Sequence, residues 1–270
     1  MNDLALQRLG DELASKSKLL IISGAGISTD SGIGDYRDED GEWKLSRPVM
    51  HQDFISDAAW RQRYWARSMH GYPQFSRAEP NVAHQCLARW EKDGRVLGVI
   101  TQNVDRLHQR AGSRQVIDLH GRLDHVRCMS CHKTRERQQV QSWLEQHNAH
   151  VMQADFAPTA DGDAELALSS FADVRVPECE CGGMLKPDVV FYGDSVPRAI
   201  VDLAYHWVDQ ADAVLVVGSS LAVFSSFRFV RKADQLGIPV YAINRGKTRA
   251  DALYHIKVEM GCADALAALT

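Results

Sequence analysis

The stretch KLLIISGAGISTDSGIGDYR at residues 18–37 decides the fold. Its first part, KLLIISG (18–24), is a short apolar run that ends at a glycine, the pattern of a buried strand that feeds a turn. Gly24 and Gly26 let backbone N–H groups approach a pyrophosphate at a helix N-terminus. A tight turn also favours glycine for steric reasons, so this loop alone fits either a nucleotide-binding loop or a closely packed turn.

Similar apolar runs recur along the chain and are suited to central parallel strands. Between them lie helical patterns: Asn81 can cap a helix whose Ala83, Leu87 and Trp90 share one face and which Gly94 ends. This alternation predicts an α/β fold with a Rossmann-like, doubly wound parallel sheet. The further runs are RVLGVIT (95–101), QVIDLHG (115–121), PDVVFYG (187–193), DAVLVVG (212–218) and PVYAIN (239–244).

Two stretches interrupt this alternation and predict a smaller module. Residues 39–80 are rich in Trp, Arg and Tyr and indicate a helical insertion, and residues 125–186 hold four cysteines. The middle of the second insertion, about 150–175, is polar and lacks periodicity, so we expect a mobile segment there. The sequence thus assigns 1–38, 81–124 and 187–270 to the nucleotide-binding domain.

Composition excludes several classes of protein. The chain has 270 residues, of which 45% are hydrophobic and 24% charged, as expected for a soluble globular protein. With a net charge of −4 it has no overall basic field, so we expect neither nucleic-acid binding nor attraction to anionic lipid. No apolar run is long enough for a membrane span and the N-terminus does not resemble a signal peptide, so we expect a cytoplasmic protein.

The cysteine spacing indicates a metal site. Cys128 and Cys131 form C-x-x-C, and Cys179 and Cys181 form C-x-C, with 47 residues between the pairs. Four thiolates can surround Zn²⁺ tetrahedrally and leave no position for water or substrate, so the sequence predicts a structural zinc. A redox dithiol and free buried cysteines are the competing interpretations.

The glycine loop is not that of an ordinary dehydrogenase. Such a loop continues into a full helix and a second strand, with an acid about 20 residues on. Here Gly32 and Gly34 end the helix early, and Asp35, Tyr36 and Arg37 follow at once. Beside a bound nucleotide these three would offer a carboxylate, an aromatic wall and a cation, which is more than hydride transfer requires. A surface loop with ordinary charges is the alternative interpretation.

At this point the chain resembles the sirtuin family, and the wording of RQRYWARSMHGYPQF (61–75) and LKPDVVFYGDSVP (185–197) resembles its class II branch. Two departures are visible, because Gly34 replaces a usual proline and Tyr36 a usual phenylalanine. The matching motifs, in family order, are GAGISTDSGIGDYR (24–37), TQNVD (101–105), LHG (119–121), the two cysteine pairs, PDVVFYGD (187–194), GSS (218–220) and IN (243–244).

The resemblance implies an NAD-dependent protein-lysine deacylase that consumes NAD and releases nicotinamide and 2′-O-acyl-ADP-ribose. It also implies that the four cysteines hold structural Zn²⁺ and that proteins bearing acyl-lysine are the substrates. The NAD-binding residues that it implies are Gly24, Ala25, Gly26, Ile27, Ser28, Asp35, Tyr36, Arg37, Gln102, Asn103, Val104, Asp105, Gly218, Ser219, Ser220, Asn244 and Cys262.

Three residues are candidates for the chemistry. His120 follows the run QVIDL at a strand end, where α/β sheets hold ligands, and its near-neutral intrinsic pKa suits a general base. The resemblance implies that His120 acts on the ribose hydroxyls and that Asn103 and Asp105 hold the nicotinamide end of NAD. As isolated residues, Asn103 and Asp105 could also simply cap a turn.

Candidate substrate-binding residues come from two segments. Tyr64 and Arg67 are three apart in a predicted helix and share a face. The pair resembles one in sirtuins that act on acidic acyl groups, so it indicates either a pocket for a succinyl- or glutaryl-type carboxylate or a packing face, and acetyl also remains open. In the family the peptide adds as a strand, which implicates Val190, Phe191, Tyr192 and Gly193 as well as residues 221–224.

Two other functions remain open from the sequence. The same NAD site could serve transfer of ADP-ribose to a protein side chain. A non-catalytic zinc-ribbon module that holds a nucleotide is the second alternative, but it predicts a basic groove and has no use for His120.

Overall fold

The computed structural model describes residues 2–35, 49–158, 164–166 and 171–270. These residues form two compact units. The first consists of the described parts of Met1–Lys44, Glu79–Leu119 and Val196–Thr270, and the second of those of Leu45–Ala78 and His120–Ser195. Residues 120–124 and 187–195, which the sequence groups with the nucleotide-binding domain, lie in the second unit. Of these, residues 121–124 and 187–189 belong to two strands that pair with each other.

The first unit is built on a parallel sheet of six strands in the order β11-β10-β9-β1-β2-β3. From β1 the chain builds outward through β2 and β3, and it later returns to the other side of β1 with β9. The carboxyl ends of β1 and β9 therefore form the switch point at which doubly wound sheets bind their ligands. The strands are β1 (Leu19–Ser23), β2 (Val96–Thr101), β3 (Val116–Asp118), β9 (Ala213–Val217), β10 (Val240–Ile243) and β11 (Ile256–Val258).

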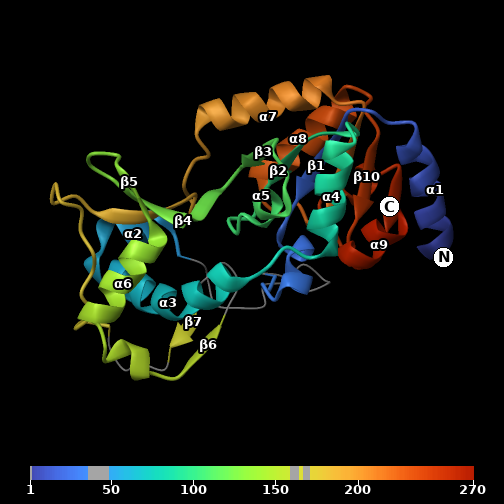
Figure 1. Ribbon diagram of the computed structural model, residues 1–270. Coiled ribbons are helices and arrows are strands. Elements are labelled where there is room, and N and C mark those ends of the chain that lie inside the picture. Colours follow the sequence, from blue (N-terminus) through green and yellow to red (C-terminus); the bar gives the residue numbers. More distant parts are fainter. Residues whose placement is uncertain (1, 36–48, 159–163, 167–170) are drawn as a thin grey trace. The chain divides into compact units, whose positions relative to one another are not determined.

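Helices cover both faces of this sheet, which confirms the predicted doubly wound α/β class (Figure 1). One apolar cluster joins the sheet to α1 (Asn2–Ala14), α4 (Val82–Lys92) and α9 (Cys262–Ala268). A second joins the opposite face to α7 (Arg198–Gln210) and α8 (Phe224–Gln235). The five residues of β1 and the five of β9 are all buried, as expected for strands in which Ser23 is the one polar residue.

Helix α4 forms as its sequence predicts. The side chain of Asn81 accepts a hydrogen bond from the Ala83 N–H at 2.9 Å, which satisfies a free donor of the first turn. Ala83, Leu87 and Trp90 are buried along one face. Gly94 adopts φ +76° just after the helix, where a left-handed residue stops it.

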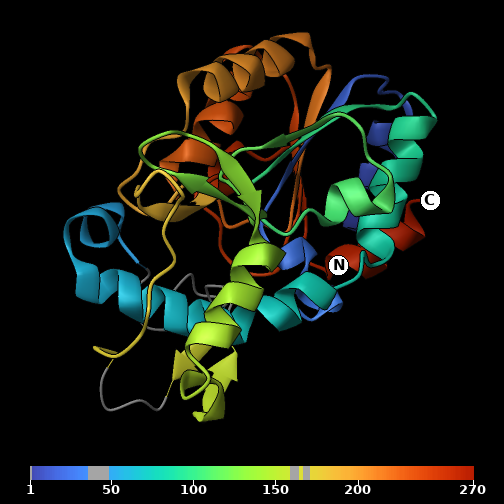
Figure 2. The same ribbon diagram turned by 60° about the vertical axis from the view of Figure 1, so that its left-hand side comes forward.

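The second unit combines an antiparallel sheet with helices (Figure 2). The sheet order is β5-β4-β8. Its core contains buried residues of the helices and of β4 and β8, among them Trp65, Val126 and Leu144. The elements are β4 (Gly121–Cys128), β5 (Thr134–Glu136), β8 (Leu185–Val189), α2 (His51–Ser56), α3 (Ala58–Arg77), α6 (Arg137–His147) and the hairpin of β6 (Phe156–Pro158) and β7 (Ala164–Leu166).

The expectation that residues 187–193 form a central parallel strand is wrong. Residues 185–189 form β8, which pairs antiparallel with β4 at the edge of the smaller sheet. Pro187 gives the physical reason, since a proline has no N–H for a ladder on both sides and is tolerated at an edge. The pattern of apolar residues was right, but it could not distinguish between the two sheets.

The polar segment around 150–175 is partly ordered into structure. Residues Val151–Gln153 form one turn of 3₁₀ helix, and the β6–β7 hairpin follows. Residues 159–163 and 167–170 lie outside the described part of the chain. Within the described residues, we find no helix with the length and apolar character needed to cross a membrane.

Candidate active site

Two short 3₁₀ turns follow β1 in place of a full helix. They are η1 (Ala25–Ile27) and η2 (Thr29–Ser31), and Gly32 ends the second with φ +80°. The early break that the sequence predicts is therefore present. Because no long helix leaves this loop, polar side chains of the following residues can enter the region where a dinucleotide lies in a doubly wound fold.

The glycines of this loop allow two backbones to approach closely. The Gly26 N–H donates to the Gly218 carbonyl at 2.9 Å, and Gly218 itself has φ +60°. A methyl group on Gly26 would lie 3.0 Å from the Gly218 Cα, and one on Gly218 would lie 2.3 Å from the Ile27 nitrogen. The loops that follow β1 and β9 thus meet at the switch point, where only glycine fits.

A hydrogen-bonded network of Asn103, Ser28 and Asp105 lies beside this loop. Asn103 Nδ2 donates to the Gly24 carbonyl at 3.1 Å and to Ser28 Oγ at 3.0 Å. Ser28 Oγ donates to Asp105 Oδ2 at 2.7 Å, and Asp105 Oδ1 accepts the Leu107 N–H at 2.9 Å. Asp105 therefore forms a turn with the first residue of a short helix, α5 (Leu107–Ala111), whose N-cap is Arg106, while its second oxygen accepts from the loop.

Burial raises the pKa of Asp105, although the hydrogen bonds from Leu107, Ser28 and Asn103 oppose that shift. A carboxylate held in such a place has lost much of its hydration. It can stabilise positive charge more strongly than an exposed carboxylate, because less water screens the interaction.

Gln102 connects the ends of β2, β9 and α8. Its Nε2 donates to Ser219 Oγ at 2.7 Å, and its Oε1 accepts from Ser226 Oγ at 2.9 Å. Ser219 Oγ also accepts the Leu221 N–H at 3.1 Å. The side chains of Gln102 and Ser219 are therefore fixed by their neighbours.

The other predicted NAD-binding residues that the structure describes in the first unit lie in different settings, with Asp35 in the loop after η2 and Cys262 at the start of α9. Ile27 is fully buried in the core, so only its backbone is available to a ligand. Burial raises the pKa of Cys262 to about 12, which keeps it a neutral thiol. Ala25, Asp35, Val104 and Ser220 are partly exposed and Asn244 is buried, whereas Tyr36 and Arg37 lie outside the described residues.

A buried polar cluster that no sequence motif marks supports this network. Ser23 Oγ donates to Thr101 Oγ1 at 2.9 Å and contacts His108 Nε2 at 2.8 Å. Thr101 Oγ1 also accepts the Asn103 N–H at 3.1 Å, so the cluster reaches the backbone of Asn103.

The same cluster continues to a second buried histidine. His84 packs against His108, and its Nδ1 contacts the capping oxygen of Asn81 at 3.2 Å. The available signal was a single polar residue that ends each of two apolar strands.

His120 belongs to the second unit, where its backbone is fixed at the start of β4. The His120 carbonyl accepts the Val190 N–H at 2.8 Å. Gly121 follows with φ +82°, and a methyl group there would lie 2.2 Å from the Asp188 carbonyl oxygen. Only glycine therefore fits at the third position of the Leu-His-Gly motif, where the backbone after His120 turns sharply and passes close to β8.

Aromatic rings surround the predicted substrate segment in the same unit. Phe191 lies 5.3 Å from Phe54 and 5.4 Å from Tyr64 between ring centres, both edge to face. The Tyr192 carbonyl accepts the His51 N–H at 2.8 Å, and Gly193 has φ +78°. Phe191 and Tyr192 are thus held by α2 and α3 of their own unit, whereas Val190 is bonded to the His120 carbonyl.

Tyr64 and Arg67 are both buried, in a part of α3 where every residue from Tyr64 to Tyr72 is buried. Arg67 is only 7% exposed, and its Nε donates to the Ala164 carbonyl in β7 at 2.7 Å. A buried guanidinium is unusual because it loses hydration. The position of the Arg67 guanidinium is therefore set by the β6–β7 hairpin as well as by α3.

The four predicted metal ligands come together. All four Sγ atoms lie within 4.8 Å of one another, with Cys128 to Cys181 at 3.5 Å and Cys131 to Cys179 at 3.7 Å. Zn–S bonds of about 2.3 Å in a tetrahedron require sulfur separations of about 3.8 Å, so the set fits Zn²⁺. The N–H groups of Ser130 and Cys131 point at Cys128 Sγ, each at 3.4 Å, as in a metal-binding knuckle.

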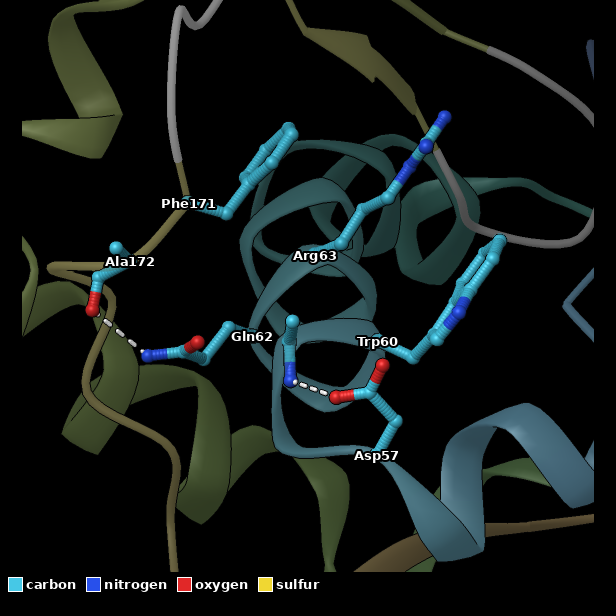
Figure 3. Close-up of a pocket in the computed structure, with 7 residues that line it drawn as sticks. Asp57, Trp60, Gln62, Arg63, Phe171 and Ala172 are labelled. Atoms are coloured by element: carbon cyan, nitrogen blue, oxygen red, sulfur yellow. Dashed lines mark hydrogen bonds between the residues drawn. The ribbon is translucent and has the colours of Figure 1, made fainter.

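One pocket of about 330 Å³ opens on the first turns of α3 (Figure 3). Trp60 and Phe171 stand on either side of Arg63, and Gln62 Nε2 donates to the Ala172 carbonyl at 2.8 Å. None of the residues that the sequence assigns to the site lines this pocket.

The sequence of this chain is similar to those of known proteins. The model of the Sir2 family matches residues 24–225. The chain is 53% identical to NAD-dependent protein deacetylase 2 of Bradyrhizobium diazoefficiens over 98% of both chains. It is 47% identical to NAD-dependent protein deacylase Sirt4 of Drosophila melanogaster over 97% of this chain and 85% of that protein.

Solved structures give the same result. A structure described as Sir2-p53 peptide-NAD+ has a TM-score of 0.80 and 29% identity, and covers 98% of this chain and 96% of that one. Another, from work on the mechanism and regulation of Sir2 enzymes, has a TM-score of 0.79 and 31% identity, and covers 100% of this chain and 97% of that one. With its glycine loop, its polar network at the switch point and its four-cysteine cluster, this chain belongs to the Sir2 family.

Proposed function

We propose that this chain is an NAD-dependent protein-lysine deacylase that consumes NAD as a co-substrate. The observation that carries the proposal is the network of Asn103, Ser28 and Asp105 against the glycine loop at the switch point of the sheet. A hydride-transfer enzyme has no need of a partly desolvated carboxylate at that place. The relatives named as NAD-dependent deacetylases and deacylases support the same activity.

The reaction transfers an acyl group from lysine to the ribose of NAD. The acyl-lysine carbonyl oxygen displaces nicotinamide from C1′, and attack by the 2′-oxygen followed by water releases lysine and 2′-O-acyl-ADP-ribose. Positive charge develops on the ribose when nicotinamide leaves. Asp105 and the Asn103 amide are the groups that we assign to that end of NAD, because a fixed carboxylate and amide stabilise developing charge without reorganisation.

His120 is the general base in this proposal. An imidazole titrates near neutral pH and can take a proton from a ribose hydroxyl. Gly121 and the bond from Val190 fix the backbone of His120, which restricts where its ring can lie. Gly24, Gly26, Gly218 and Ser219 are assigned to the phosphates and riboses by their place at the strand ends.

The four cysteines hold zinc with a structural role. Four sulfur ligands fill a tetrahedral ion, so no position remains for a catalytic water. Cys128 is the last residue of β4 and Cys131 follows it, whereas Cys179 and Cys181 precede β8, so the metal closes the end of the smaller sheet. The ion therefore acts on the stability of the second unit.

For the acyl group, we propose that Tyr64 and Arg67 bind a carboxylate at the far end of an acidic acyl chain. Both are buried on one face of α3, and the bond to Ala164 orients the Arg67 guanidinium. A planar guanidinium binds a carboxylate with two parallel hydrogen bonds, and a tyrosine hydroxyl can add a third. A preference for plain acetyl-lysine would contradict this assignment.

The function is tested by nicotinamide release from NAD with a panel of acetyl-, succinyl-, glutaryl- and lipoyl-lysine peptides. The wild type should release nicotinamide only with an acyl-lysine peptide, and His120→Ala should lose at least about a hundredfold in rate. Mass spectrometry should find acylated ADP-ribose. ADP-ribose attached to protein, without deacylated peptide, would establish ADP-ribosyl transfer instead, and no release under any condition would refute both activities.

A further inference from the structure

Helix α8 begins with an exposed aromatic ring among arginines. Phe224 is 44% exposed. The guanidinium carbons of Arg228, Arg231 and Arg249 lie 5.2, 5.1 and 5.8 Å from the centre of its ring. Arg249 also lies 4.6 Å from the centre of the Phe227 ring. We call these five side chains the Phe224 cluster.

The arginines of the Phe224 cluster form no ion pair with any carboxylate that the structure describes. Arg228 Nε donates to the Phe224 carbonyl at 3.4 Å, and Arg249 Nη1 donates to the Ala222 carbonyl at 3.1 Å, so both bonds go to backbone oxygen. Among the residues that the structure describes, no carboxylate lies within ion-pair distance of the three arginines. The chain as a whole has a net charge of −4, so the cluster is a local reversal of sign.

The cluster lies at the edge of the sheet where ligands bind. Phe224 begins α8 soon after β9 ends, and Arg249 follows β10. The Arg249 N–H donates to the Ser220 carbonyl at 2.9 Å, which ties the cluster to the Gly218 turn. The carboxyl ends of β9 and β10 therefore present both the glycine turn and the arginines.

We propose that the Phe224 cluster is a docking surface for Asp and Glu side chains that flank the acylated lysine of the protein substrate. The proposal rests on the deacylase function. Each guanidinium can bind a carboxylate with two hydrogen bonds, and the exposed ring offers an apolar contact to the methylene groups of a glutamate. Acidic segments around the acyl-lysine are thus the preferred substrates.

A nucleic acid is the less suitable occupant of the Phe224 cluster. Its affinity depends on many phosphate contacts along a continuous basic surface, and the net negative charge of this chain opposes a long polyanion. A short acidic peptide needs only the few contacts that three arginines and one ring provide. The charge pattern therefore favours the peptide.

The test compares three peptides that share one acyl-lysine and differ only in flanking residues, which are Glu, Gln or Lys. Each exposed ion pair changes affinity by up to about fivefold, so kcat/KM should be about five- to tenfold higher for the Glu peptide than for the Gln peptide. Salt should reduce this ratio. In the Arg228→Ala/Arg231→Ala double variant the ratio should fall to about one, and Arg231→Glu should shift the preference toward the Lys peptide.

Arg89→Ala is the matched control, because Arg89 is an exposed helical arginine of the same unit outside the cluster, and it should keep the wild-type ratio. Fluorescence anisotropy of the labelled peptides without NAD separates docking from turnover. Arginine-dependent binding of the Glu peptide without deacylation would refute the deacylase function but support the Phe224 cluster as a docking surface. Equal use of the Glu and Gln peptides, an unchanged ratio in the double variant, or equal competition by a single-stranded oligonucleotide would overturn the proposal.

Discussion

The imidazole rings of His84 and His108 lie edge to face with their centres 4.9 Å apart, inside the first unit. Both residues are buried, and no described residue forms a hydrogen bond with His84 Nε2 or His108 Nδ1. Burial lowers the pKa of His84 to about 4, and burial together with the charge of His84 lowers that of His108 well below its ordinary value. The pair is therefore neutral in the folded protein.

This pair predicts a loss of stability in mild acid. Between pH 6.5 and about 4 the unfolded chain binds a proton at His84 that the folded protein does not, so the free energy of unfolding falls as the pH drops through this window. The contribution is present in full above pH 6.5 and amounts to about 3 kcal/mol. Urea unfolding of His84→Gln should depend less on pH in this window than the wild type, whereas exposed His150→Gln should behave as the wild type. An identical pH dependence in His84→Gln would contradict the assignment.

Asp105→Asn should reduce catalysis more than stability. The new side chain keeps an oxygen for the Leu107 N–H but places an NH₂ group toward Ser28 Oγ, which has donated to a carboxylate. Loss of one buried charged hydrogen bond changes kcat/KM for NAD by about tenfold or more. Steady-state nicotinamide release measures the effect, and exposed Asp93→Asn at the end of α4 is the control. Wild-type kinetics in Asp105→Asn would remove Asp105 from the site.

Gly121→Ala should destabilise the second unit. The added methyl group would lie 2.2 Å from the Asp188 carbonyl oxygen at a φ of +82°, so both the strand pair and the backbone must shift. We expect a loss of at least about 2 kcal/mol in the free energy of unfolding. In Gly237→Ala, where φ is +70° but nothing lies within 4 Å, only the backbone strain of about 1 kcal/mol remains. Equal losses in the two variants would show that the contact with β8 is unimportant.

Removal of zinc should unfold the second unit. Cys179→Ser is expected to purify with much less than one zinc per chain and with a lower melting temperature, because metal binding is part of the folding free energy. Cys86→Ala, a change in the buried core of the first unit, should keep its zinc. Metal analysis by mass spectrometry together with thermal unfolding decides this. A full complement of zinc in Cys179→Ser would exclude Cys179 as a ligand.

Arg67→Ala should change the acyl preference. If the guanidinium binds a distal carboxylate, kcat/KM for glutaryl-lysine falls at least about tenfold further than that for acetyl-lysine. The ratio is the informative quantity, because loss of the bond to Ala164 affects both substrates. Arg63→Ala, an exposed arginine one turn earlier on α3, should leave the ratio unchanged. An acetyl preference in the wild type that survives Arg67→Ala would exclude the acidic pocket.

The central sheet could be predicted because its strands are buried on both faces. Runs such as LLIIS and AVLVV have no polar side to assign, so they indicate parallel strands of an α/β fold. Strand β11 could not be found in this way, because Ile256–Val258 is only three residues long and contains Lys257. The direction of β8 could not be found either, since antiparallel pairing with β4 depends on a partner about 60 residues away along the chain.

For the candidate active site, motifs and spacing identified the residues at the glycine loop but not the buried polar residues that support them. The four cysteines come together as their spacing requires, and Asn103, Asp105 and Ser28 are bonded to one another. His84 and His108 carry no motif of their own, and their significance depends on packing between α4 and α5 that periodicity does not specify.

The strand order also sets the order in which the protein can fold on the ribosome. Strand β1 lies between β2 and β9, yet β9 is made about 190 residues after it. The second unit is complete once Ser195 has emerged, whereas the first still lacks three of its six strands. In a nascent chain stopped there, the four cysteines of the complete second unit can already bind metal. The partial sheet of the first unit, in contrast, exposes the unpaired edge of β1 to chaperones.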